Sequence, residues 1–161
     1  MKIFTEFIVL SENLPMPSED EFCPSLWQMP DFDSDGDFYG NYPDKKWSYL
    51  FINAYDENKR ITSGLNVWVY RDDSGTMCGF KEAHDLKRFI DYKQAGRYDY
   101  EKDIASLSSV MVTSLQFTTH QVDLYKEFLM TVHFYLTYTK GIVVNYYDSD
   151  ANNFYEKLMS S

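Results

Sequence analysis

Carboxylates are the side chains in this sequence whose number and spacing could support chemistry. Ten acids and no Lys or Arg lie between residues 3 and 44, so residues 1–44, including Lys2, carry −9 of the formal net charge of −10. The densest group has an acid at every second position, in Asp31, Asp33, Asp35 and Asp37. Carboxylates at this density can bind a cation or attract a basic protein. We expect the function to involve these four residues.

A calcium site is one interpretation of this spacing. Asp31-x-Asp33-x-Asp35-Gly36 matches the first half of an EF-hand loop, in which alternate carboxylates converge on the ion and Gly permits a tight turn. The second half differs, because Tyr42 stands where the loop has its bidentate Glu, and prolines stand where the flanking helices would be. We therefore predict a solvated acidic loop without a cofactor, and keep calcium binding through Asp31, Asp33, Asp35 and Asp37 as the alternative.

Catalytic motifs are not found. His84, His120 and His133 have no zinc-like spacing, and the sequence contains no H-E-x-x-H, G-x-S-x-G or phosphate-binding glycine loop. Cys23 lies among carboxylates, which disfavour a thiolate. The sequence therefore predicts a protein that is not an enzyme and has no catalytic residues.

Aromatic residues interleave with the carboxylates, and this favours recognition of a protein partner. Tyr and Trp are enriched at interface hot spots, while exposed charges raise association rates. We predict that the carboxylates set the association rate and that Tyr39, with Trp27 or Tyr42 beside it, sets the residence time. The alternative is that Trp27 and Tyr42 merely anchor the loop on the protein's own core. The predicted partner-binding residues are Trp27, Asp31, Asp33, Asp35, Asp37, Phe38, Tyr39 and Tyr42.

Length and composition indicate one domain spanning residues 1–161, since 44% hydrophobic and 18% aromatic residues suffice for a single core. A pI near 4.6 argues against direct binding of nucleic-acid phosphates and favours a basic partner. Cys23 and Cys78 are isolated, which fits a reducing compartment, and we expect the cytoplasm. No apolar stretch reaches the roughly 20 residues that span a bilayer.

Hydrophobic periodicity predicts an α+β fold: a central mixed or mainly antiparallel sheet of about five strands, flanked by about three helices. Residues 11–45 contain all five prolines and are predicted to form a long irregular acidic segment. Trp47, Tyr49, Phe51 and Tyr55 are expected on one face of a central strand that is covered on both sides. The aromatic residues of this strand and of its hairpin partner are interpreted mainly as core. Expected strands are 3–10, 47–55, 65–70, 107–117 and 142–147, with a short one at 76–80, and expected helices are 82–96, 118–141 with a capping box at Thr118, and 151–158.

The chain resembles the small acidic immunity proteins that bacteria pair with secreted or contact-delivered toxins. The features it shares with them are its size, its acidity and an ending in which the strand Gly141-Ile142-Val143-Val144 precedes a helix from Asp148 to Leu158. The resemblance implies a non-enzymatic inhibitor that neutralises a cognate basic toxin domain, such as a nuclease, without contacting nucleic acid or membrane. A DNA-mimicking viral or mobile-element inhibitor is a further alternative, which requires carboxylates spaced along an extended face.

Overall fold

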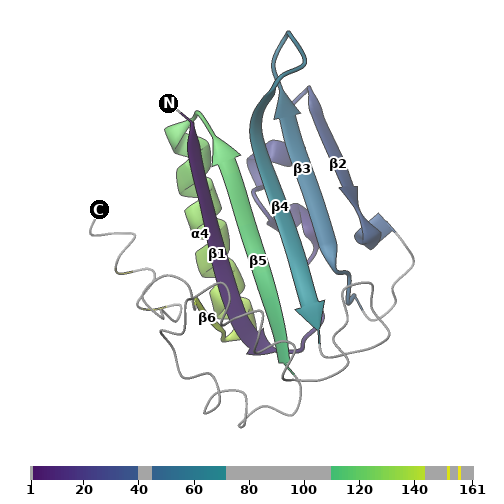
Figure 1. The fold of residues 1–161 in the computed structure, drawn as a ribbon, viewed down its shortest axis with the longest axis vertical. Helices are drawn as coiled ribbons and strands as arrows, with labels where there is room; N and C mark the ends of the chain where they lie inside the picture. The colour runs from purple at the N-terminus through teal and green to yellow at the C-terminus, as the bar shows by residue number, and fades with distance from the viewer. Residues whose placement is uncertain (1, 40–44, 72–109, 144–151, 153–155, 157–161) are drawn as a thin grey trace.

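The structure is a computed structural model that describes residues 2–39, 45–71, 110–143, 152 and 156. The predicted strand 76–80 and helix 82–96 lie outside these residues, as does most of the predicted helix 151–158. Within the described part, the fold is α+β, with one open antiparallel sheet and one long helix (Figure 1).

Six strands form the sheet in the order β2-β3-β4-β5-β1-β6, and every hydrogen-bonded pair is antiparallel. The sequence prediction of about five strands therefore missed one strand. Of the two predicted kinds of sheet, mixed or mainly antiparallel, the hydrogen-bonded pairs match the antiparallel one. β5 and β6 both pair with β1, so they run parallel to each other and the helix between them makes a crossover. The strands are β1 (Ile3–Glu12), β2 (Phe32–Gly36), β3 (Tyr49–Tyr55), β4 (Ile61–Arg71), β5 (Val110–Thr119) and β6 (Ile142–Val143).

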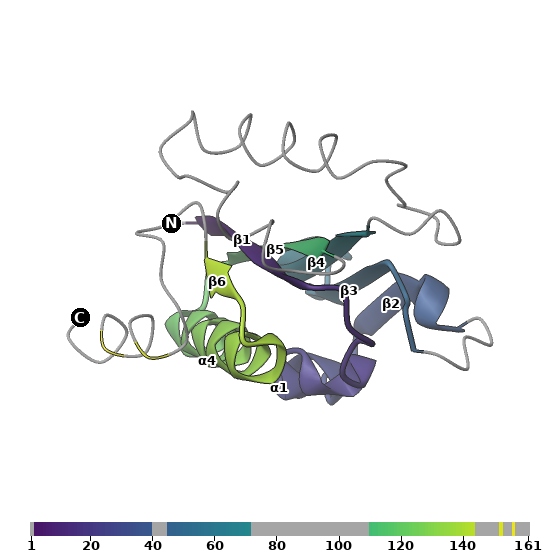
Figure 2. The same cartoon turned by 90° about the horizontal axis from the view of Figure 1, so that it is seen from below.

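One face of the sheet is covered by α4 (Val122–Thr139), with the short α1 (Pro24–Trp27) beside it (Figure 2). Apolar residues recur on α4 at helical spacing, and Phe128, Val132 and Leu136 are fully buried. The Phe128 ring stacks on Phe117 of β5 with centroids 4.8 Å apart. Alternate residues of the strands complete this core, in particular Leu50, Ile52, Leu65, Val67, Val69 and Leu115.

Two expectations about helices need correction. α4 is the one long helix of the described residues, which is fewer than the predicted three, because α1, η1 (Glu19–Glu21) and η2 (Asp37–Tyr39) are each a single turn. The N-cap of α4 is Gln121 and not Thr118, because β5 continues to Thr119 and the Thr119 hydroxyl accepts the Gln121 N–H at 3.0 Å. None of the helices in the described ranges is long and apolar enough to cross a membrane.

The segment 11–45 is more ordered than predicted. Its described part contains the end of β1, η1, α1, the whole of β2 and η2. Buried Arg71 fixes the start of this segment, since its Nη1 donates to the Leu14 carbonyl at 2.7 Å and to the Asn13 side chain. The Cys23 N–H donates to Thr131 of α4 at 3.1 Å, which ties α1 to the long helix.

Candidate functional site

The middle of the acidic motif, which contains Asp33 and Asp35, is the edge strand β2 and not a loop. Asp33 pairs with Asn53 and Asp35 with Phe51 on β3. Because side chains alternate along a strand, Asp33 and Asp35 share the face that α4 leaves uncovered, while Phe32 and Ser34 lie on the other. Both carboxylate residues are exposed. Acids at every second position were thus a sign of a strand, whereas the sequence interpretation had predicted a loop.

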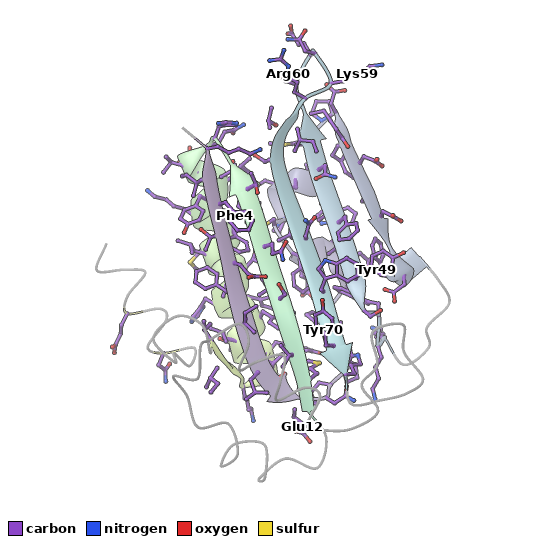
Figure 3. All side chains as sticks on the ribbon, in the orientation of Figure 1. Phe4, Glu12, Tyr49, Lys59, Arg60 and Tyr70 are labelled. Carbon is purple, nitrogen blue, oxygen red and sulfur yellow. The ribbon has the colours of Figure 1, made fainter. Side chains whose placement is uncertain are left out.

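An aromatic cluster adjoins these acids on the same face. The Phe51 ring lies 5.1 Å from that of Trp68 and 5.5 Å from that of Tyr49, between centroids. All three rings are half-buried. Phe51 is also the cross-strand partner of Asp35, so carboxylates and rings are direct neighbours. We call Asp33, Asp35, Tyr49, Phe51 and Trp68 the acidic aromatic face; Tyr49 is labelled on it in Figure 3.

The two faces of β3 differ in burial, and its coverage on both sides stays a prediction because residues 72–109 lie outside the described part of the fold. Leu50, Ile52 and Ala54 are buried in the core, on the side that contacts α1, while the alternate residues of β3 are half-buried. Trp47 does not share the aromatic side, because it precedes the strand and its ring packs on Phe22, 5.7 Å away, in the core. An available signal was missed: the aliphatic residues fall on one face, while the other mixes rings with amides such as Asn53 and Asn66.

A polar network continues the same face toward β1. The Glu6 carboxylate accepts hydrogen bonds from the Ser114 hydroxyl and the Gln116 amide, both at 2.8 Å. Farther along the strands, at the Arg71 end, Ile8, Leu10 and Val112 of this face are buried. The accessible part is therefore the half nearer β2 and the β3–β4 turn.

The Asp37 carboxylate has a structural role, because it accepts hydrogen bonds from the start of β3 and the residue before it. It accepts the Ser48 N–H at 2.8 Å, the Ser48 hydroxyl at 2.6 Å and the Tyr49 N–H at 3.0 Å. These bonds close the connection between η2 and β3. Ser48 is fully buried, so water cannot replace the two bonds that Ser48 donates. Asp37 is accordingly engaged within the fold, unlike Asp33.

Two of the aromatic residues predicted to bind a partner, Trp27 and Phe38, pack on the core and not beside Asp33 and Asp35. The Trp27 indole N–H donates to the Phe22 carbonyl at 3.1 Å, and its ring makes an edge contact with Phe38 at 6.1 Å. Phe38 in turn contacts buried Trp47. These contacts match the alternative that Trp27 anchors its segment to the core. Tyr42 and the side chain of Tyr39 lie outside the description, so their roles stay predictions.

The geometry does not favour the calcium interpretation. Alternate residues of an extended strand lie about 6.8 Å apart, so Asp33 and Asp35 project side by side from β2 and do not surround one ion, and Asp31 precedes the strand. Gly36 serves packing, because a Cβ there would meet the Phe38 ring and lie 2.6 Å from the Tyr49 carbonyl. Within the described ranges no group of three His, Cys, Asp or Glu residues could hold a metal ion.

Cys23 is the one cysteine in the described ranges and is poorly suited to nucleophilic chemistry. It is buried beside Thr131, and burial raises the pKa of its thiol to about 12. The thiol therefore stays protonated at neutral pH. Among the described residues, Cys23, His120 and His133 belong to no group of three that could hold a metal ion.

Comparison with known proteins gave no relatives: no family model, no curated protein and no solved structure matches this chain.

Proposed function

We propose that this protein is a non-enzymatic inhibitor that binds a basic partner domain, of the kind found in toxin–immunity pairs, through the acidic aromatic face. The observation that carries the proposal is the placement of exposed Asp33 and Asp35 beside the half-buried rings of Tyr49, Phe51 and Trp68. The Asp33 side chain accepts no hydrogen bond from the described residues, so its charge is available to a partner.

The two kinds of side chain have different tasks in this proposal. Carboxylates at the rim of an interface steer encounter and are screened over about 8 Å at physiological salt, so they act on the association rate. Aromatic rings that lose their remaining exposure on binding act mainly on dissociation. Phe51 and Trp68 replace Trp27 in the second task, because the structure places Trp27 against the core.

The test takes as candidate partner the protein encoded by the gene adjacent to this one, with binding kinetics measured at several salt concentrations. Asp33→Asn combined with Asp35→Asn should lower the association rate about tenfold and flatten its salt dependence. The matched control is Asp20→Asn with Asp123→Asn, which removes the same charge from exposed positions on η1 and α4. Equal association rates for the two double variants would exclude this face as the docking surface.

A DNA-mimicking inhibitor gains support from one observation. The sequence interpretation ranked it lower because the carboxylates were expected in an irregular segment, whereas Asp33 and Asp35 project from an extended strand. A partner bound in this way presents its nucleic-acid site to β2, so duplex DNA should compete with the inhibitor. If saturating DNA leaves the complex intact, the partner is held elsewhere than at its nucleic-acid site.

A further inference from the structure

A cavity of about 440 Å³ opens at the end of β2, beside the acidic aromatic face. Its lining comes from two segments that are distant in sequence, Asp31 and Phe32 on one side and Tyr55, Asp56, Glu57 and Lys59 on the other. The Tyr55 N–H donates to the Asp31 carbonyl at 2.9 Å and joins the two segments. Figure 3 shows Lys59 at the tip of the β3–β4 turn.

The walls of this cavity are held in place before any ligand arrives. The Asp56 carboxylate accepts the N–H groups of Asn58 and Arg60 at 2.8 and 2.9 Å. The Asp56 N–H also donates to the Arg60 carbonyl at 2.9 Å, which closes the turn. On the opposite wall the Phe32 ring rests on Trp27, with centroids 5.9 Å apart, and remains 36% exposed. A rigid cavity reduces the entropic cost of binding.

The lining combines rings with negative charge. Phe32 and Tyr55 provide aromatic surface, and Asp31, Asp56 and Glu57 outnumber the single cation, Lys59. Asp56 is committed to the turn, whereas the Asp31 and Glu57 side chains accept no hydrogen bond from the described residues. Two available carboxylates beside aromatic rings suit a cation that is flat and donates several hydrogen bonds.

We propose that this cavity receives an arginine side chain of the partner. A guanidinium can stack on Phe32 or Tyr55 while its N–H groups bind the Asp31 or Glu57 carboxylate, whereas a lysine ammonium supplies only a compact charge. This inference rests on the proposed function for the identity of the partner, but the cavity can be tested without it. Lys59 lines the same cavity, so we expect its ammonium to compete with the arginine for these carboxylates.

The experiment is a titration of the ¹⁵N-labelled full chain with Nα-acetyl-arginine amide, followed by amide chemical shifts. We expect saturable shifts at Asp31, Phe32, Tyr55 and Glu57, with at least fivefold weaker binding for the lysine analogue. Nα-acetyl-citrulline amide has the same shape without the charge and should cause no saturable shift. Equal responses to arginine and citrulline, or no saturable response to arginine, would overturn the proposal.

Variants separate this cavity from the neighbouring face. Asp31→Asn with Glu57→Gln should weaken arginine binding at least fivefold, while Lys59→Ala should strengthen it about twofold. Asp33→Asn with Asp35→Asn should leave it unchanged, and the dispersion of each spectrum confirms folding. If the Asp31 and Glu57 variant keeps full affinity for arginine amide, the cavity proposal fails. A loss of partner binding in the Asp33 and Asp35 variant alone would support the proposed function while rejecting the arginine site.

Discussion

Replacing Asp37 with Ala should destabilise the fold, although Asp37 belongs to the same acidic motif as the proposed binding residues. Its carboxylate holds the start of β3 through the N–H and hydroxyl of Ser48 and the N–H of Tyr49, at 2.6–3.0 Å. Removing the carboxylate leaves those three donors without their acceptor. The cost depends on whether water can reach each of them.

The loss of unfolding free energy depends mainly on Ser48, because Ser48 is fully buried and Tyr49 is not. A buried donor left unsatisfied costs about 1–3 kcal/mol, and Ser48 has two, while the Tyr49 N–H can recover a water partner. Asp37→Ala should therefore lower the unfolding free energy by about 3 kcal/mol. In a chain of this size that loss corresponds to a melting temperature lower by about 6–12 °C. Asp37→Asn keeps one oxygen acceptor and should lose about half as much free energy.

Urea denaturation followed by tryptophan fluorescence measures this loss, with Asp33→Ala as the matched control. Asp33 is exposed and accepts no hydrogen bond from the described residues, so its replacement should change stability by less than about 0.5 kcal/mol. An Asp37→Ala variant within about 0.5 kcal/mol of the wild type would refute the assignment of a structural role to this carboxylate.

Three further predictions concern the core. Phe128→Ala should cost about 3–5 kcal/mol in chemical denaturation, because the fully buried ring leaves a cavity against Phe117. Tyr135→Phe should cost about 1–2 kcal/mol, since the buried Thr113 hydroxyl loses its partner at 2.5 Å. The Cys23 thiol should resist iodoacetamide at pH 8 until the chain is unfolded. Burial raises the pKa of this thiol from its ordinary value of 9.0 to about 12, so the unfolded chain loses the proton first and stability should fall between pH 9 and pH 12 more steeply than in Cys23→Ala.

The sequence predicted those elements whose signals are local. α4 carries Phe128, Val132 and Leu136 at helical spacing over several turns, and such long periodic segments are rarely ambiguous. β3 and β4 alternate aliphatic residues with rings and amides across a polar turn, so their hairpin was also correctly predicted. The ends of these elements were less certain, as the N-cap of α4 shows, because Thr119 continues the pairing of β5 with β1.

β2 could not be predicted in the same way. Its five residues, Phe32 to Gly36, include two Asp, one Ser and one Gly, all of which have low strand propensity. The strand exists because β3 supplies its hydrogen-bonding partners, and that pairing is a property of the fold and not of the segment. The same holds for the candidate site. Asp33 and Asp35 were identified from composition, but their aromatic neighbours lie on β3 and β4, and only the strand register shows that these residues are adjacent.

The position of Asp33 and Asp35 on an edge strand also has a consequence for solubility. Exposed edges can pair with other chains, and charged side chains on an edge oppose that pairing. This protective role and the proposed recognition role require the same geometry, because both need exposed carboxylates that project from β2. They differ in what they require of the neighbours. Protection needs only charge, whereas recognition also needs the half-buried rings of Phe51 and Trp68 on the same face, and it is this combination that favours a binding surface.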